Sequence, residues 1–236
     1  MLSKILQNYL KFWSQKYLIR TRPKIIAITG SVGKTTTKEA IFAVLLEKFG
    51  SNVAKSEGNL NTETGVPLAI LGYKKSPKNF YEWLPVLITV PFACFSRVKF
   101  DFLVLEMAAD KPGDIRYLTS FVKPYIAVVT AIGPSHLEKF GTIEKIIEEK
   151  TSIFWGLPHD GWAVMNIDDE NLRKASYGGR WSKFTYAIGR DADIHAKNIS
   201  TGIENKRPFT KFAITGKVNL QINEEILGGQ ANVMRP

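Results

Sequence analysis

The chain has 236 residues, 44% of them hydrophobic, a formal net charge of +10 and a single cysteine, Cys94. This length and apolar content suit one large domain with a buried core. A single cysteine excludes a disulfide framework within the chain and a cysteine-ligated metal cluster, and it fits a reducing cytosol. The basic charge balance suits a nucleic acid, an anionic membrane or a phosphorylated small molecule as the partner.

The first 22 residues predict a basic amphipathic helix. No acidic residue precedes Glu39, and the segment lacks the apolar core and cleavage site of a signal peptide. Two interpretations are open: the helix lies on a membrane surface, or it packs on its own domain or on further chain. The apolar residues that recur at helical spacing are Leu2, Ile5, Leu6, Tyr9, Phe12, Trp13 and Tyr17.

Residues 25–39 (IIAITGSVGKTTTKE) predict a phosphate-binding loop between a buried strand at 24–29 and a helix at 34–49. The backbone N–H groups of such a turn and of the helix N-terminus converge where phosphate oxygens can lie. Lys34 adds a mobile positive charge, and the hydroxyl of Thr35 can hold Mg²⁺. The spacing, G-x-x-G-K-T, is shorter than the usual G-x-x-x-x-G-K-[ST], and a glycine turn without a ligand is the alternative. The residues expected to contact a nucleotide are Gly30, Ser31, Val32, Gly33, Lys34, Thr35 and Thr36.

Strand and helix signals alternate after residue 23 and predict an α/β fold with a doubly wound, mostly parallel sheet. In such sheets ligands bind beyond the carboxyl ends of the strands. Glu106, His136 and Asn166 each lie at or just after the end of a predicted strand, so we expect them to meet the phosphate loop at one edge. The expected strands are 24–29, 101–107, 125–131 and 161–166, and the expected helices are 34–49, 115–122 and 142–156.

Two further segments stand out. Residues 84–95 (LPVLITVPFACF) form an apolar run inside a hydrophobic insertion at 72–100. This run is too short to cross a bilayer, and Pro85 and Pro91 interrupt it, so we expect a packed hairpin, with membrane-surface contact as the alternative. After residue 182, short alternating runs predict antiparallel strands in a small β subdomain near the C-terminus.

Several motifs together make residues 23–236 resemble the ATP-binding central domain of the Mur ligases. The resemblance is closest to the branch that adds D-alanyl-D-alanine to a UDP-N-acetylmuramoyl (UDP-MurNAc) tripeptide. It implies an ATP-dependent peptide ligase of peptidoglycan precursor synthesis, in which a substrate carboxylate attacks the γ-phosphate and an amine then displaces phosphate from the acyl phosphate. The motifs are ITGSVGKTT (28–36), GNLNTETGVPLAIL (58–71), VLEMAADKPGDI (104–115), VVTAIGPSHLEKFGT (128–142), IIEEK (146–150), AVMNIDD (163–169) and GGQANV (228–233).

The resemblance also implies roles for single residues. Lys34 would contact the β- and γ-phosphates of ATP, Thr35 and Glu106 would hold a first Mg²⁺, and His136 would lie at a second. Lys150 matches a lysine that many Mur ligases carbamylate with CO₂, which would turn an ammonium into an anion beside the metals. The position of Glu106 at the end of an apolar strand (DFLVLE) also favours a ligand, with a surface carboxylate as the alternative. Residue types alone leave His136 as a hydrogen-bonding loop residue and Lys150 as a solvated helix residue.

Substrate contacts are implied in the same way. Asn59, Asn61 and Thr62 match the substrate loop of the family, although such residues also simply shape turns. Asn232 matches an asparagine near the adenine, but the sequence GQAN lacks the histidine of the familiar G-x-H-N pattern. The expected partners are a UDP-MurNAc-peptide and D-Ala-D-Ala, not nucleic acid, in the cytoplasm, with peripheral contact to the inner membrane surface through 1–22 or 84–95.

The expected organisation is a helix at 1–22 followed by a central domain at 23–236 that is incomplete at its C-terminal end. The sugar-nucleotide domain and the C-terminal domain usual in the family would be missing from the sequence or supplied by partners. Two other functions are open: another Mur-type ligase resembling folylpolyglutamate synthase, and a non-catalytic nucleotide-binding scaffold. The presence of all five of Lys34, Thr35, Glu106, His136 and Lys150 favours an enzyme.

Overall fold

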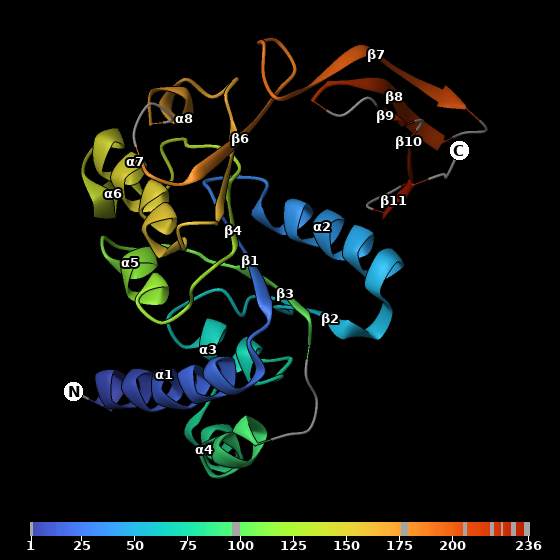
Figure 1. The fold of residues 1–236 in the computed structure, drawn as a ribbon. Helices are drawn as coiled ribbons and strands as arrows, with labels where there is room; N and C mark the ends of the chain where they lie inside the picture. Colours follow the sequence, from blue (N-terminus) through green and yellow to red (C-terminus); the bar gives the residue numbers. More distant parts are fainter. Residues whose placement is uncertain are drawn as a thin grey trace.

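A nine-stranded sheet forms the centre of the computed structural model (Figure 1). The structure describes residues 2–95, 100–175, 179–204, 207–217, 220–222, 224–227 and 230–233. The strands are β1 Lys24–Thr29, β2 Val53–Lys55, β3 Phe102–Glu106, β4 Ile126–Val129, β5 Trp162–Asn166, β6 Ser182–Ala187, β7 Ile194–Glu204, β8 Arg207–Gly216, β9 Leu220–Ile222, β10 Glu224–Leu227 and β11 Gln230–Val233. The helices are α1 Leu2–Thr21, α2 Lys34–Phe49, α3 Gly65–Ile70, α4 Phe80–Cys94, α5 Asp114–Thr119, α6 Leu137–Phe140, α7 Ile143–Thr151 and α8 Glu170–Ala175, with 3₁₀ turns at Gly50–Asn52 and Ser152–Gly156.

The strand order is β2-β3-β1-β4-β5-β6-β7-β8-β9, and β10 and β11 form a separate pair. Neighbouring strands from β2 to β7 are parallel, whereas β8 and β9 pair in the antiparallel sense. The predicted fold class, a doubly wound sheet with antiparallel strands near the C-terminus, is therefore confirmed. One detail differs, because β6 pairs parallel with β5 and extends the parallel sheet. Sequence alternation reports which faces of a strand are buried and does not report its direction.

Successive residues of the central strand β1 face opposite layers, as the pleat requires. Ile25 and Ala27 belong to the larger core, which also takes buried side chains from α1, α3, α5 and α7. Ile26 and Ile28 belong to a smaller core against α2, with Ile41, Phe42 and Leu45 packed on it. Figure 1 shows α2 on one side of the sheet and α5, α6 and α7 on the other.

The apolar run predicted as a hairpin is instead part of a helix, α4, so that expectation is wrong. Asn79 caps this helix, because its side chain accepts a hydrogen bond from the Glu82 amide at 3.0 Å. Pro91 has no N–H for the carbonyl four residues earlier, that of Leu87. The Tyr9 hydroxyl of α1 donates to that carbonyl at 2.7 Å, so a residue far away in the sequence supplies the missing partner.

The basic N-terminal segment forms α1 and packs on its own domain, which is the second of the two interpretations offered by the sequence. Leu10, Ser14 and Tyr17 are buried on the face of α1 turned to α3 and α4. Arg20 donates from Nε to the carbonyl of Cys94 at 3.1 Å, at the last turn of α4. The two helices lie side by side in Figure 1, joined by these contacts as well as by apolar packing.

Candidate functional site

The phosphate loop runs from the end of β1 to the start of α2. Gly30 and Gly33 have φ of 148° and 80°, conformations that side chains rarely adopt. A Cβ on Gly30 would lie 2.1 Å from Oγ1 of Thr130, so the loop passes directly against the end of β4. The helix N-terminus therefore opens onto a turn whose shape depends on Gly30.

The loop that follows β4 holds the phosphate loop from outside. Ser31 donates its amide to the carbonyl of Ala131 at 2.8 Å, and its hydroxyl donates to the carbonyl of Gly133 at 3.0 Å. The hydroxyl of Ser135 donates to Ser31 Oγ at 2.9 Å, and that of Thr130 donates to the carbonyl of Val32 at 2.6 Å. The hydroxyl of Ser31 and the carbonyl of Val32 thus hold the phosphate loop against the segment that follows β4.

Lys34 stands at the first position of α2, half-buried beside the loop. Its Nζ donates to the carbonyls of Gly30 at 2.8 Å and Ser31 at 3.2 Å. Burial lowers the pKa of this ammonium, and the nearby Glu106 carboxylate opposes that shift. A flexible cation held only by loop carbonyls can turn to an incoming phosphate, which is the stronger acceptor.

Glu106, at the end of β3, lies at the centre of the site and is only 3% exposed. Its Oε2 accepts a hydrogen bond from the Thr35 hydroxyl at 3.0 Å, and its Oε1 accepts one from the Asn61 side-chain amide at 3.0 Å. The two oxygens are thereby oriented from opposite sides, one by α2 and the other by the loop after β2. The sequence alternative of a surface carboxylate does not hold for this residue.

Lys38 is a residue of the site that the sequence analysis did not single out. It is 1% exposed, and its Nζ lies 3.5 Å from Glu106 Oε2 and 3.6 Å from Glu39 Oε1. A buried lysine needs such partners, because an unpaired charge inside a protein is very costly. The available signal was its spacing: Lys38 follows Lys34 by four residues and so shares one face of α2.

His136 and Asp110 approach each other across the mouth of the site. His136 has a left-handed backbone, with φ of 55°, at the start of α6. Its Nε2 lies 3.7 Å from Oδ1 of Asp110, and both side chains are exposed. Among the described residues no group of three histidine, cysteine or acidic side chains is placed to hold a metal.

Lys150 is a buried residue near the end of α7, with 2% of its surface exposed, and not the solvated helix lysine that its sequence context indicates. Burial lowers its pKa to about 8, and the charge of Lys34 adds to that effect, while Glu149, Asp110 and Asp114 oppose it. Glu149 itself accepts hydrogen bonds from the amides of Gly113 and Ile115, both at 2.7 Å. Lys150 therefore lies close enough to Lys34 and Asp110 for their charges to act on its pKa.

The phosphate loop, Glu106 and Asp110 border an open cavity of about 620 Å³ at the carboxyl edge of the sheet, whereas Lys38, His136 and Lys150 are not among its lining residues. Asn61 and Thr62 line it, whereas Asn59 is exposed and not among its lining residues. The side chain of Asn232, in β11, lies outside what the structure describes. The lining residues are Ser31, Val32, Gly33, Lys34, Thr35, Thr36, Asn61, Thr62, Glu106, Ala108 and Asp110.

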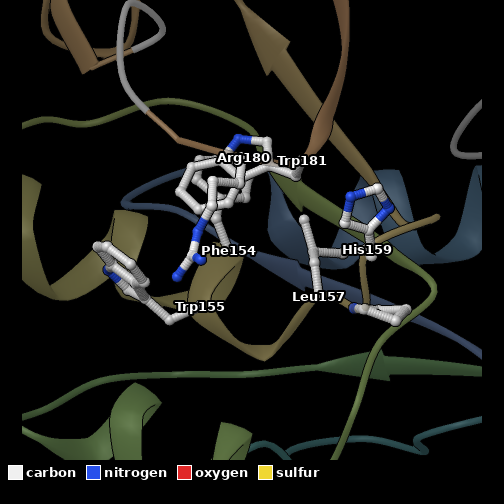
Figure 2. Close-up of a pocket in the computed structure, with 7 residues that line it drawn as sticks. Phe154, Trp155, Leu157, His159, Arg180 and Trp181 are labelled. Atoms are coloured by element: carbon white, nitrogen blue, oxygen red, sulfur yellow. The ribbon is translucent and has the colours of Figure 1, made fainter.

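A second pocket, of about 240 Å³, lies before the starts of β5 and β6 (Figure 2). The Trp181 ring packs against Phe154 and Trp155, with ring centroids 5.4 and 5.7 Å apart. The lining shown in Figure 2 is completed by Leu157, Pro158, His159 and Arg180. The amino ends of parallel strands lie at the opposite edge from their carboxyl ends, so this pocket is not part of the phosphate-loop site.

A glycine turn from a buried strand into a helix, a lysine and a hydroxyl at the first helical positions, and a buried carboxylate facing them define a P-loop nucleotide-binding α/β domain. The comparison with known families is more specific. The model of the Mur ligase middle domain matches residues 28–234. The chain therefore belongs to the Mur ligase family.

Individual relatives agree with this assignment. The chain is 33% identical to the UDP-N-acetylmuramoyl-tripeptide–D-alanyl-D-alanine ligase of Bacillus subtilis over 87% of its own length, and 32% identical to that of Escherichia coli over 84%. It covers 38% of each of those two proteins. A solved structure of MurF ligase from Thermotoga maritima in complex with ADP is 31% identical, with a TM-score of 0.64 over 87% of this chain and 44% of that one.

The close approach of Gly30 to Thr130 leads to a stability prediction. Gly30→Ala places a Cβ against Thr130 Oγ1 at a strained φ, so we expect the free energy of unfolding to fall by about 2 kcal/mol or more. The matched control is Gly133→Ala in the facing loop, where the nearest atom to a new Cβ is 4.0 Å away. Urea unfolding followed by tryptophan fluorescence compares the two, and equal costs would contradict the tight packing of the loop.

Proposed function

We propose that this chain is the ATP-binding part of a ligase that joins D-Ala-D-Ala to a UDP-MurNAc-tripeptide through an acyl phosphate. The observation that carries the proposal is the buried pairing of Glu106 with Thr35 beside a phosphate loop that presents Lys34. The relatives named above, which are 31–33% identical, support the choice of substrates. The chain spans 36–39% of the length of four curated relatives, so the remaining contacts to substrate belong to parts that this chain does not cover.

The donor set at the loop fits Mg²⁺. Magnesium prefers oxygen ligands at 2.0–2.1 Å in an octahedron, which places neighbouring ligand oxygens about 3 Å apart. The Thr35 hydroxyl and Glu106 Oε2 are 3.0 Å apart, at the point where the helix N-terminus faces the cavity. When bound there, Mg²⁺ would neutralise charge on the phosphates during transfer.

Each residue of the loop has a defined task in this proposal. The amides of Gly30 and of Val32 to Thr36, together with the Lys34 ammonium, bind and orient the phosphates, which is most of what a phosphoryl transfer asks of a protein. Lys38 positions Glu106, because its buried ammonium lies 3.5 Å from Oε2. Asn61 holds the other carboxylate oxygen, and with Thr62 it lines the wall where the substrate carboxylate would approach.

Lys150 suits carbamylation by CO₂, since only the neutral amine reacts. With a pKa of about 8, roughly one fifth of the side chain is neutral at pH 7.4, against roughly one thousandth for an ordinary lysine. The amine nitrogen attacks CO₂ and loses a proton, which leaves a carbamate anion in place of an ammonium. Such an anion near Lys34 would relieve the repulsion between two cations and add an oxygen donor for a metal.

The same proposal assigns a place to the remaining residues. His136 would meet a second Mg²⁺, supported by its unusual backbone and its approach to Asp110. Asn59 and Asn232 would touch the substrate and the adenine. We propose a cytoplasmic place of action at the inner membrane surface, supported by the exposed cations Lys4, Lys16 and Arg20 of α1. The solved folylpolyglutamate synthases, at 17% identity, share the fold alone.

The function test uses the natural protein with ATP, Mg²⁺, UDP-MurNAc-tripeptide and D-Ala-D-Ala. We expect the amide product and one phosphate per bond, detected by mass spectrometry and phosphate release.

Lys34→Ala should weaken ATP binding at least tenfold in calorimetry, because charge-assisted hydrogen bonds are lost. Lys48→Ala, at the other end of α2, is the control and should bind ATP normally. A wild type that binds ATP but joins glutamate to a folate, and does not join D-Ala-D-Ala to the tripeptide, would overturn the substrate assignment.

The carbamate test uses ¹³C-bicarbonate and NMR. We expect a carbamate carbonyl resonance in the wild type that is absent in Lys150→Arg, because a guanidinium keeps its proton and does not add CO₂. Lys145→Arg, an exposed lysine of the same helix, is the control and should retain the resonance. The same spectrum from wild type and Lys150→Arg would show that the reactive amine lies elsewhere.

A further inference from the structure

Helix α4 is apolar on both of its sides, although only one side is packed. Val90 and Cys94 are buried against the core, and Trp83 and Val86 pack beside them. The opposite side carries an outward stripe of large apolar residues at helical spacing, with Tyr81 84% and Phe92 74% exposed. A helix that is apolar all round is normally buried all round, so this stripe has the character of a contact surface. The α4 stripe consists of Tyr81, Leu84, Ile88, Phe92 and Phe95.

Helix α1 continues the same surface. Ile5, Phe12 and Ile19 follow each other at intervals of seven residues and are all exposed, so they form one line along the helix. Trp13 bridges the two lines, because its ring packs edge-to-face against Phe12 at 5.1 Å and against Phe95 at 6.3 Å. The α4 stripe and this line of α1 therefore form one apolar surface across two helices, which lie side by side in Figure 1.

The charges on α1, on α4 and in the segments that flank them are nearly all positive. No acidic residue occurs in residues 1–38, and Glu82 is the only one in residues 64–100. Glu82 is engaged at the start of α4, where it accepts hydrogen bonds from Lys78 and Asn79. Lys16 lies over the Phe12 ring with its Nζ 5.4 Å from the ring centroid, so charge and apolar surface are interleaved. The exposed cations on α1, after it and before α4 are Lys4, Lys16, Arg20, Arg22, Lys24, Lys74, Lys75 and Lys78.

We propose that the face formed by α1 and α4 binds the surface of a membrane rich in anionic lipid. Aromatic and aliphatic side chains enter the boundary between headgroups and acyl chains, while flanking lysines and arginines pair with lipid phosphates. A second copy of the chain is a poorer occupant, because two cationic rims would face each other. Among the described helices none is long and apolar enough to traverse a bilayer, and α4, with 15 residues, spans only about 22 Å.

The position of the surface is compatible with the phosphate-loop site. Helix α1 leads into the amino end of β1, and α4 precedes the amino end of β3. The phosphate loop and Glu106 lie at the carboxyl ends of the same two strands. A membrane bound to the α1–α4 face would therefore leave the cavity open to water on the opposite edge, and the face can bind lipid whether or not the site ligates peptides.

The test is sedimentation of the 236-residue chain with vesicles of phosphatidylcholine alone and of phosphatidylcholine with phosphatidylglycerol. We expect binding to the anionic vesicles at least tenfold stronger than to the neutral ones, weakening as salt is raised to 0.5 M because screening reaches surface charges. The variant Tyr81→Ser, Ile88→Ser, Phe92→Ser should bind anionic vesicles at least tenfold more weakly. These three side chains point away from the core, and circular dichroism checks that the variant is folded.

The matched control is Val44→Ser, Ile188→Ser, which removes exposed apolar side chains from other faces and should leave vesicle binding unchanged. Equal binding by wild type and the α4 triple variant would overturn the proposal, as would no binding to either vesicle. Sedimentation velocity without lipid tests the alternative that a second copy of the chain binds this face. A dimer of the wild type that the α4 variant abolishes would assign the face to a second copy and also overturn the proposal.

Discussion

The hydrogen bonds of the buried Glu106 carboxylate hold the candidate site together. One oxygen is bound by Thr35 of α2 and the other by Asn61 of the loop after β2, while Lys38 supplies a cation 3.5 Å away. A carboxylate that is 3% exposed is stable only because these partners replace water. The same contacts fix the distance between the phosphate loop, strand β3 and the substrate loop, so one charged group sets the geometry of all three.

The order of the strands explains why these parts meet. β1 lies between β3 and β4, so the phosphate loop emerges with Glu106 on one side and the Thr130–Ser135 loop on the other. Ser31 and Thr130 join the loop to the second neighbour, as Thr35 joins it to the first. Lys150 and His136 come from the segment after β4, so they approach from that same side. The sheet thus brings residues more than a hundred positions apart in the chain to one edge.

Local patterns in the sequence were sufficient to predict the phosphate loop, its flanking strand and helix, and the parallel sheet, because each depends on neighbouring residues. They were insufficient for α4, where two prolines in an apolar run indicated a hairpin. The contact that makes the helix possible, from Tyr9 to the Leu87 carbonyl, joins residues 78 positions apart. The burial of Lys38 and of Lys150 was missed for a similar reason. A lysine on a helix is expected to be exposed to solvent unless the packing around it is known. Asn59 and Asn61 are indistinguishable in the sequence, yet only Asn61 reaches the carboxylate.

The most direct test of the role of Glu106 is the Mg²⁺ dependence of ATP binding, measured by calorimetry on the wild type and on Glu106→Gln. The substitution keeps the size of the side chain and removes its charge. We expect Mg²⁺ to tighten ATP binding by the wild type at least tenfold and to have little effect on the variant, because the hard anionic oxygen that magnesium prefers is gone. The same tightening by Mg²⁺ in both proteins would contradict our proposal that Glu106 holds the metal.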